Sequence, residues 1–198
     1  MAGMTPRERW HALFAGEKPD RIPTDYWATG EVTRRLLAEL GCADKEALYT
    51  RLHIDGVMHI DPVRTVNHFP GDSQADIWGL RRTAIQYGTG SYEEFANHPL
   101  ADSSTVEELD AYPWPSPDDL DYDRFRREIA AAPRHRFIRS GEFEPFLLYC
   151  ALRGMENAMM DLLVDQAFVE AALEHIFRYY YSVNERTFEV GGGLIDVT

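Results

Sequence analysis

The residues best suited to chemistry lie where predicted strands end. His59 and Asp61 alternate along residues 57–61, a short predicted strand that Pro62 closes. Alternate residues of a strand share one face, so an imidazole and a carboxylate here can meet one ligand or exchange a proton with it. We take both as candidate catalytic residues. The alternatives are a histidine hydrogen-bonded within the strand wall and an aspartate that forms a turn before proline.

Glu142 and Glu144 form a second candidate pair, within residues 140–145. Two carboxylates on one loop can act as acid and base, or can bind a metal or an amine. Glu144 directly precedes Pro145, near the start of a predicted helix, where negative charge is favourable. We therefore assign Glu142 to catalysis and Glu144 to the helix cap.

Asp25, Tyr26 and Trp27 stand at the end of the first predicted strand, and Asp196 lies in the last one. An aromatic pair can stack on a planar or methylated ligand. We include all four as candidate substrate-binding residues. For Trp27, packing in the core is the favoured alternative, and for Tyr26 the two interpretations are balanced.

Strands and helices alternate along the chain. Hydrophobic periodicity and capping residues predict strands at 22–27, 57–61, 136–140 and 194–198, and helices at 5–15, 31–40, 44–52, 121–132 and 145–189. The last helical region is expected to break near Gly154 and Asp165. Such alternation indicates parallel β/α units, and four of them predict half of a (β/α)8 TIM barrel. In that architecture the active site lies at the carboxyl ends of the strands.

The segment between the second and third strands is less regular. Residues 80–87 and 91–95 flank a Gly-Thr-Gly turn and predict a hairpin, and residues 105–109 predict one helical turn. Residues 112–117 contain three prolines, which prevent regular structure, so we expect a strap whose Trp114 packs onto the body. The run 179–181 of three tyrosines on the last helix is expected to lie half in the core and half on the surface.

The last predicted strand would leave a parallel sheet with an open edge, which is normally covered. We therefore expect residues 1–198 to be the N-terminal part of a single barrel domain that continues beyond Thr198. The alternative is a complete small open-sheet α/β domain.

Charge and cysteine content narrow the functional classes. The net charge of −13, from 33 acidic and 20 basic residues, argues against binding to nucleic acid or to an anionic membrane surface. Cys42 and Cys150 are far apart, which favours a reducing, cytoplasmic location. The sequence has no apolar run of transmembrane length. It also has no His/Cys cluster with the spacing of metal ligands, so no cofactor site is predicted within the chain.

Several short blocks resemble the uroporphyrinogen decarboxylase (URO-D) superfamily. The first block is Thr5-Pro6-Arg7-Glu8-Arg9, followed by the linker Gly16-Glu17-Lys18-Pro19-Asp20-Arg21-Ile22-Pro23 that leads into the first barrel strand. Later blocks match in the same order: Asp76-Ile77-Trp78-Gly79, His98-Pro99-Leu100, Gly154-Met155-Glu156-Asn157 and residues 193–196. The resemblance implies a URO-D-type barrel and brings Asp61 close to the family's catalytic aspartate. We also include Trp78, from a block similar to the methyltransferase-like branch, among the substrate-binding candidates.

One departure from the family concerns the loop after the first strand. The namesake decarboxylases carry arginines there, which bind substrate carboxylates through bidentate contacts. Residues 25–31 contain no arginine, so this loop would bind a substrate with eight carboxylates poorly. The resemblance therefore implies a methyltransferase-like enzyme that moves one-carbon units with a corrinoid (cobalamin) partner.

Two other functions stay open at this point. One is a carboxy-lyase of the uroporphyrinogen decarboxylase type, in porphyrin biosynthesis, and the other is a non-catalytic module that binds a ligand or a corrinoid protein. The zinc ligands of the methyltransferase branch lie in the C-terminal half of the barrel, beyond Thr198. The resemblance thus implies a small-molecule substrate, a partner-borne corrinoid and a zinc ion held outside these residues.

Overall fold

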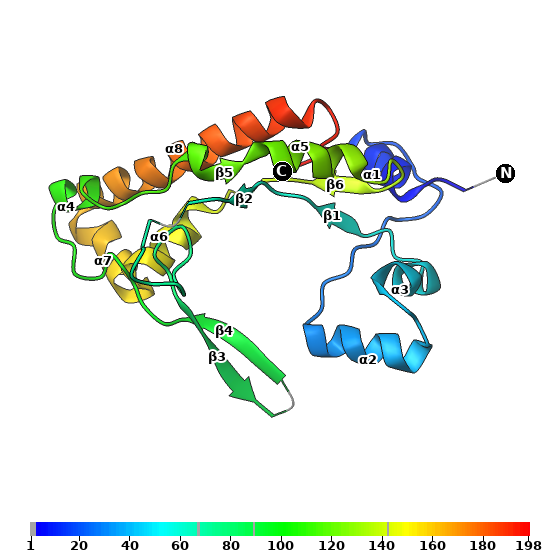
Figure 1. Ribbon diagram of the computed structural model, residues 1–198, viewed down its shortest axis with the longest axis horizontal. Coiled ribbons are helices and arrows are strands. Elements are labelled where there is room, and N and C mark those ends of the chain that lie inside the picture. Colours follow the sequence, from blue (N-terminus) through cyan, green and yellow to red (C-terminus); the bar gives the residue numbers. More distant parts are fainter. Residues whose placement is uncertain (1–2, 67, 89, 142) are drawn as a thin grey trace. The chain divides into compact units, whose positions relative to one another are not determined.

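The computed structural model describes residues 3–66, 68–88, 90–141 and 143–198 (Figure 1). The chain divides into two compact units, which we describe separately. Unit 1 contains Met1–Ile60, Arg126–Ser140 and Gly191–Val197. Unit 2 contains Asp61–Phe125, Gly141–Val190 and Thr198.

Unit 1 is built on a short parallel sheet. Its elements are α1 (Pro6–Phe14), α2 (Gly30–Leu40), α3 (Lys45–Leu52), β1 (Val57–His59) and β6 (Phe137–Arg139), and it also holds the end of α5 (Tyr122–Ala131). β1 and β6 pair in parallel, with Met58 opposite Ile138, and Arg139 forms a parallel bridge with Val197. The carbonyl of Thr24 accepts hydrogen bonds from the backbone N–H groups of residues 55 and 56, at 3.0 and 2.9 Å. Four extended segments of unit 1 therefore lie side by side, in the same order as they occur along the chain: around residues 24, 57, 137 and 197.

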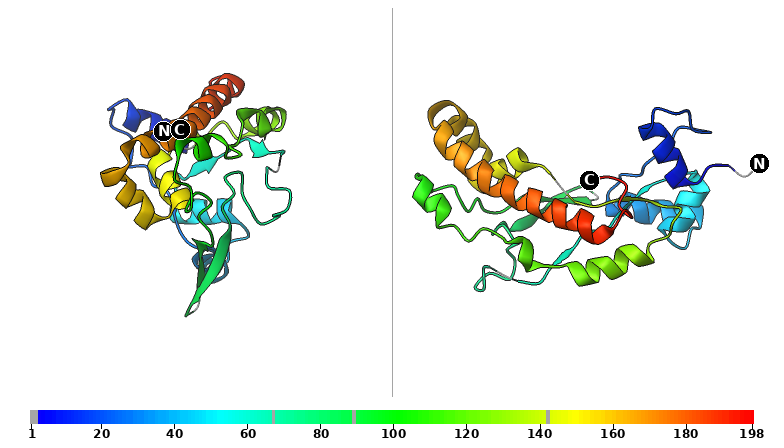
Figure 2. Two further views of the ribbon diagram at one scale, coloured as in Figure 1. Left: turned by 90° about the vertical axis from the view of Figure 1, so that its left-hand side faces the viewer. Right: turned by 90° about the horizontal axis from the view of Figure 1, so that it is seen from above.

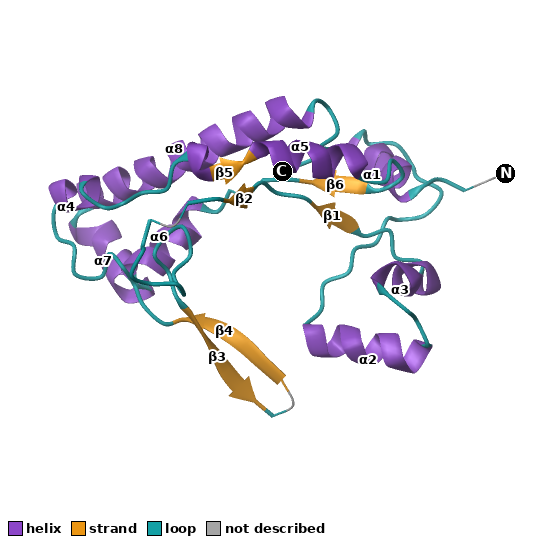
Figure 3. Cartoon of the chain, in the orientation of Figure 1, coloured by secondary structure: helices purple, strands orange, loops and turns teal. Residues whose placement is uncertain are grey.

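The first and last predicted strands are not strands in the described structure; the segment between α1 and α2 is a loop (Figure 3). At both positions, side-chain carboxylates add to a small number of backbone hydrogen bonds. Thr24 N donates to the carboxylate of Asp55 at 3.0 Å, and Val57 N donates to Asp25 at 3.1 Å. Ile138 N donates to the carboxylate of Asp196 at 2.8 Å. Because carboxylates bind the donors that a ladder would use, the backbone stays extended without continuous pairing.

The helix starts predicted from capping residues are confirmed. Thr5 Oγ1 accepts from Glu8 N at 3.2 Å while the Glu8 carboxylate accepts from Thr5 N at 2.7 Å, which completes a capping box. Asp44 caps α3 by accepting from Ala47 N at 2.8 Å. Glu144 occupies the predicted N-cap position of α6, but its side chain makes no cap hydrogen bond.

Unit 2 is mainly helical. Its elements are β2 (Val63–Arg64), β3 (Arg82–Tyr87), β4 (Gly90–Phe95), α4 (Val106–Asp110), the 3₁₀ turn η1 (Pro117–Asp119), β5 (Leu120–Asp121), the start of α5, α6 (Pro145–Arg153), α7 (Met155–Val164) and α8 (Gln166–Gly191), whose last residue belongs to unit 1. β2 and β5 pair antiparallel, and β3 and β4 form the predicted hairpin, with Thr89 outside the described residues. The hairpin projects from the helices of this unit (Figure 1, and the left view of Figure 2). The helix breaks lie at Gly154 and Asp165, as predicted.

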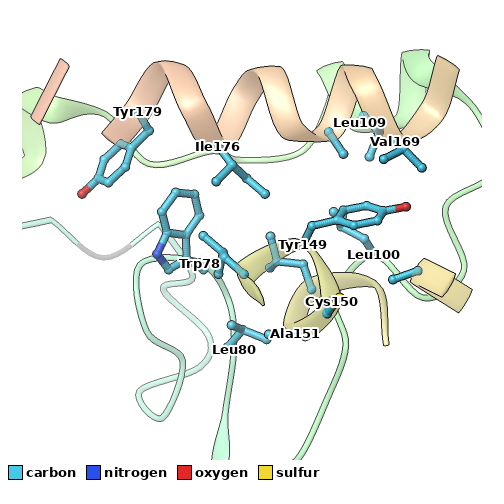
Figure 4. Close-up of a cluster of buried hydrophobic side chains, with 14 of the residues drawn as sticks. Trp78, Leu80, Leu100, Leu109, Tyr149, Cys150, Ala151, Val169, Ile176 and Tyr179 are labelled. Carbon is cyan, nitrogen blue, oxygen red and sulfur yellow. The ribbon is translucent and has the colours of Figure 1, made fainter. Parts of the chain in front are cut away.

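The core of unit 2 forms between α6, α8 and the segment around Trp78. Ile176 and Tyr179 point from α8 toward Trp78 (Figure 4). Trp114 lies against this core, where its Nε1 donates to Leu109 O at 2.7 Å, so the predicted packing of the proline-rich strap is confirmed. These aromatic contacts set the walls of the cavity described next.

Candidate functional site

A cavity of about 290 Å³ lies within unit 2. Its chemically distinctive lining consists of Asp61, Arg64, Trp78, Tyr179 and Tyr180, and the rest of the wall is mostly aliphatic. Asp61 and Trp78 were predicted from separate parts of the sequence, and the structure brings them to the same cavity. Arg64 and the two tyrosines were not predicted as site residues.

Asp61 is held at the cavity by the chain reversal after β6. Its Oδ1 accepts a hydrogen bond from Gly141 N at 2.7 Å. Gly141 has a φ of 91°, a conformation that side-chain-bearing residues rarely adopt, and a Cβ there would collide with Asn184. The glycine therefore allows its N–H to approach the carboxylate, and this contact fixes one oxygen of Asp61.

Trp78 is positioned by its own turn. The Asp76 carboxylate accepts from Trp78 N at 2.8 Å and from Leu80 N at 3.0 Å. Tyr112 Oη donates to the carbonyl of Trp78 at 2.6 Å. Burial raises the pKa of Tyr112, with Asp76 adding to the effect, so this hydroxyl remains a donor. Hydrogen bonds to both the N–H and the carbonyl of Trp78 therefore fix the backbone that carries the indole.

Three aromatic rings pack against one another at the cavity. The ring centroid of Trp78 lies 4.8 Å from that of Tyr179, edge to face, and 5.8 Å from that of Tyr180. All three side chains are less than a tenth exposed. Tyr181 is 57% exposed, which confirms the division of the tyrosine run between core and surface. The arrangement gives the cavity a stable aromatic wall.

Among the described lining residues, one charged group of each sign borders this wall. Asp61 supplies a carboxylate, and Arg64 supplies a guanidinium from β2. Arg64 is exposed, and its Nη1 reaches Ala75 O at 3.4 Å. An apolar cavity with a few charged groups at its border is a typical small-molecule site.

A second hollow of about 300 Å³ shares Trp78 and Tyr180 as a common wall. Glu144 and Arg82 are among its polar lining residues. Glu144 therefore borders this hollow as well as occupying the N-cap position of α6. Glu142 lies outside the described residues.

The remaining predicted residues belong to unit 1. Asp25 accepts from Val57 N, and Tyr26 Oη hydrogen-bonds Thr33 Oγ1 at 3.0 Å, so both have local structural contacts. Trp27 is fully exposed, at 101%, and the interpretation that it packs in the core is therefore wrong.

Asp196 and His59 have contrasting surroundings in unit 1. The Asp196 side chain is only 1% exposed, and its Oδ1 accepts from Arg7 Nε at 2.9 Å and lies 2.7 Å from His11 Nε2. Arg7 and His11 belong to α1, and Ile138 N, which also donates to Asp196, belongs to β6. Asp196 therefore links α1 to the sheet, and we leave it out of the proposed site. His59 is exposed at the end of β1.

A buried ion-pair cluster in unit 1 was missed by sequence reasoning. Asp55 is fully buried; its carboxylate accepts from Arg9 Nη1 at 2.8 Å and from Arg21 at 2.6 and 2.8 Å. Arg9 also binds Asp20, at 2.6 and 3.0 Å. The Arg9 contact holds the pKa of the Asp20 carboxyl at about 2, below its usual value of 3.8. The N-terminal blocks that resemble the URO-D superfamily therefore have a structural purpose in this chain.

No protein-family model, curated protein or solved structure matches the chain. Across residues 3–66, 68–88, 90–141 and 143–198, no group of three or more His, Cys, Asp or Glu side chains is arranged to hold a metal ion. In the same ranges, no helix is both long and apolar enough to cross a membrane.

Proposed function

We propose that this chain belongs to a URO-D-type (β/α)8 barrel enzyme of the methyltransferase-like branch. In this proposal the cavity of unit 2 binds a small ligand whose methyl group is exchanged with a corrinoid carried by a partner protein, in the cytoplasm. The observation that carries the proposal is that Asp61 and Trp78 line one cavity. The two residues were selected from separate blocks of the sequence, so their presence at the same cavity is not expected by chance.

The strand order in unit 1 supports the barrel. Segments around residues 24, 57, 137 and 197 are neighbours in chain order, and the pairs for which strand direction is defined, β1–β6 and Arg139–Val197, are parallel. Successive β/α units of a barrel have this order and direction. Carboxylates at Asp25 and Asp196 occupy donors where longer strands would pair, which explains why the ladder is short.

The cavity favours methyl transfer over tetrapyrrole decarboxylation. Pockets that enclose drug-sized ligands measure roughly 300–1,000 Å³. At about 290 Å³, this cavity suits a ligand at the small end of that range. Arg64 is the one arginine among the described residues that line it, whereas a substrate with eight carboxylates needs several cationic partners. A corrinoid is likewise too large to be enclosed and would have to approach from outside.

The residues at the cavity have separable roles in this proposal. Asp61, fixed by Gly141 N, orients the ligand through its charge. Trp78 and the tyrosines offer the methyl group an aromatic surface to pack against, while Asp61 lies at the exposed edge of the cavity. No zinc ligand is assigned among the described residues.

The test uses the 198-residue chain with cobalamin reduced to the Co(I) state. Four donors are supplied separately: a methylated ammonium compound, a methoxyarene, a methyl thioether and methanol. Transfer breaks the bond between the methyl carbon and its heteroatom, which keeps the bonding electron pair. Co(I) supplies the pair for the new cobalt–carbon bond, so no further reductant is consumed.

We expect methylcobalamin to form from one donor class at least 100-fold faster than without protein. Asp61→Asn should lower this rate about tenfold or more, since loss of an orienting charged group commonly has this size of effect. Asp102→Asn, at an exposed position outside the cavity, is the matched control and should leave the rate unchanged. Folded protein that gives no methylcobalamin with any donor would overturn the proposal in favour of a non-catalytic binding module.

A further inference from the structure

We propose that the cavity of unit 2 binds a small methylated ammonium carboxylate, a zwitterion of the betaine type. Its methylated cation would lie against the aromatic wall and Asp61, and its carboxylate would face Arg64. This inference rests on the proposed methyl transfer and names the class of its substrate. It is argued from the shape, the aromatic content and the charges of the cavity.

The aromatic wall selects for a methylated cation. Trp78 contributes the ring type with the strongest attraction for cations, and Tyr179 and Tyr180 add to it. A primary ammonium would lose hydrogen bonds to water when it entered such a wall. A quaternary ammonium has no N–H groups to satisfy, and its methyl surface gains from leaving water. The wall therefore discriminates by methylation as well as by charge.

The two charged groups select for a zwitterion. Asp61 attracts the cationic end, and its orientation is set by the 2.7 Å hydrogen bond from Gly141 N. The guanidinium of Arg64 has five N–H donors, and its contact with Ala75 O uses one nitrogen at a long distance of 3.4 Å. Donors thus remain for bidentate binding of a carboxylate. A purely cationic ligand would face Arg64 without a matching anion, and a purely anionic ligand would face Asp61.

The volume restricts the ligand to a compact one. A cavity of about 290 Å³ accommodates a trimethylammonium group and a short carboxylate arm, and is small for a ligand with a much larger body. Both charged ends of the ligand must fit within this one cavity, because Asp61 and Arg64 both line it. Glycine betaine, with one carbon between its two charges, is the simplest probe of this class.

The decisive comparison is between glycine betaine and 3,3-dimethylbutanoate. The second compound has the same shape and carboxylate but carries carbon in place of the charged nitrogen. Isothermal titration calorimetry on the 198-residue chain should give a Kd for betaine about tenfold lower than for the isostere, as a desolvated cation–π contact predicts. Equal affinity, or tighter binding of the isostere with its uncharged tert-butyl group, would overturn the inference.

Two surface variants separate the two ends of the ligand without disturbing the aromatic core. Asp61→Asn keeps an oxygen to accept from Gly141 N, and should weaken betaine at least fivefold without weakening the anionic isostere. Arg64→Gln should weaken both ligands by the same factor, because both carry the carboxylate. Asp102→Asn should change neither affinity. Circular dichroism of each variant confirms that it is folded.

Ligand binding and methyl transfer can fail independently of each other. Betaine that binds with this selectivity but forms no methylcobalamin supports the ligand class and contradicts the proposed function. Methylcobalamin formed from a methoxyarene, a thioether or methanol, with no betaine binding, supports the function and overturns the ligand class.

Discussion

Replacing Asp55 with asparagine should severely destabilise the chain. The carboxylate is fully buried and accepts one hydrogen bond from Arg9, two from Arg21 and one from Thr24 N. Asparagine keeps the shape and one acceptor oxygen, so the change removes charge with little change of volume. Arg9 retains Asp20 as a partner, whereas Arg21 loses the carboxylate that it binds through two nitrogens.

The expected loss follows from these contacts. Removing one member of a buried ion pair costs about 3–5 kcal/mol, because the remaining charge is left without compensation. Arg21 is 37% exposed and can regain some hydration, and Arg9 keeps Asp20, so the lower end applies. We expect the free energy of unfolding to fall by about 3 kcal/mol, out of a typical total of roughly 5–15 kcal/mol.

Urea unfolding followed by circular dichroism measures this loss. The matched control is Asp102→Asn, an exposed carboxylate that should change the unfolding free energy by less than about 0.5 kcal/mol. The double variant Arg21→Gln/Asp55→Asn should be less destabilised than the sum of the single variants, because the two residues are coupled. A loss below about 1 kcal/mol for Asp55→Asn, or additive single effects, would refute the reasoning that a buried ion pair fastens this unit.

Three further predictions concern stability. Gly141→Ala should destabilise the chain by about 1–3 kcal/mol, because φ is 91° there, and should weaken betaine binding. An unchanged midpoint of thermal unfolding, together with an unchanged Kd for betaine by calorimetry, would contradict this. The pKa of Asp20 is held at about 2, below 3.8, chiefly by Arg9, so its contribution is complete above pH 3.8 and is lost as the pH falls through 2. Asp20→Asn should therefore be less stable than the parent chain at pH 7 and equally stable near pH 2 in urea titrations, and a constant difference would count against the ion pair. Tyr112→Phe should cost about 1 kcal/mol by removing the bond to Trp78 O, and ultraviolet titration should lose one tyrosine of raised pKa; a titration curve identical to that of the parent chain would contradict this assignment.

The elements that depend on local signals were predictable. Thr5 and Asp44 start helices through contacts within the next three residues, and Gly154 ends α6 in a position that suits glycine. The hairpin was predictable because a Gly-Thr-Gly turn lies between two extended runs. These features need no knowledge of distant residues.

The extended segments at the two edges of the sheet and the buried ion-pair cluster around Asp55 depend on residues that are distant in the sequence. Asp196 was predicted to bind substrate because it lies at a strand end, yet Arg7, 189 residues away in sequence, binds its carboxylate. Asp55 was overlooked because charged residues are usually exposed, and only the approach of two arginines makes its burial favourable. Neither pairing has a local signal in the sequence.

The candidate site was predictable in part. Asp61 follows a strand, and Trp78 belongs to a block similar to the methyltransferase-like branch, so both could be selected in advance. Tyr179 and Tyr180 lie about a hundred residues further along the chain and reach the site only because α8 packs over Trp78. Arg64 escaped notice because one exposed arginine on a short strand has no distinguishing spacing.

The most direct test of the proposed function follows a labelled methyl group. Glycine betaine with ¹³C in its methyl groups is mixed with Co(I) cobalamin and the 198-residue chain, and the methyl carbon is observed by NMR. The proposal predicts that the signal moves from nitrogen-bound to cobalt-bound methyl, that dimethylglycine appears in equal amount, and that Asp61→Asn slows both at least tenfold. A betaine signal that stays in place in the presence of folded, betaine-binding protein would contradict it.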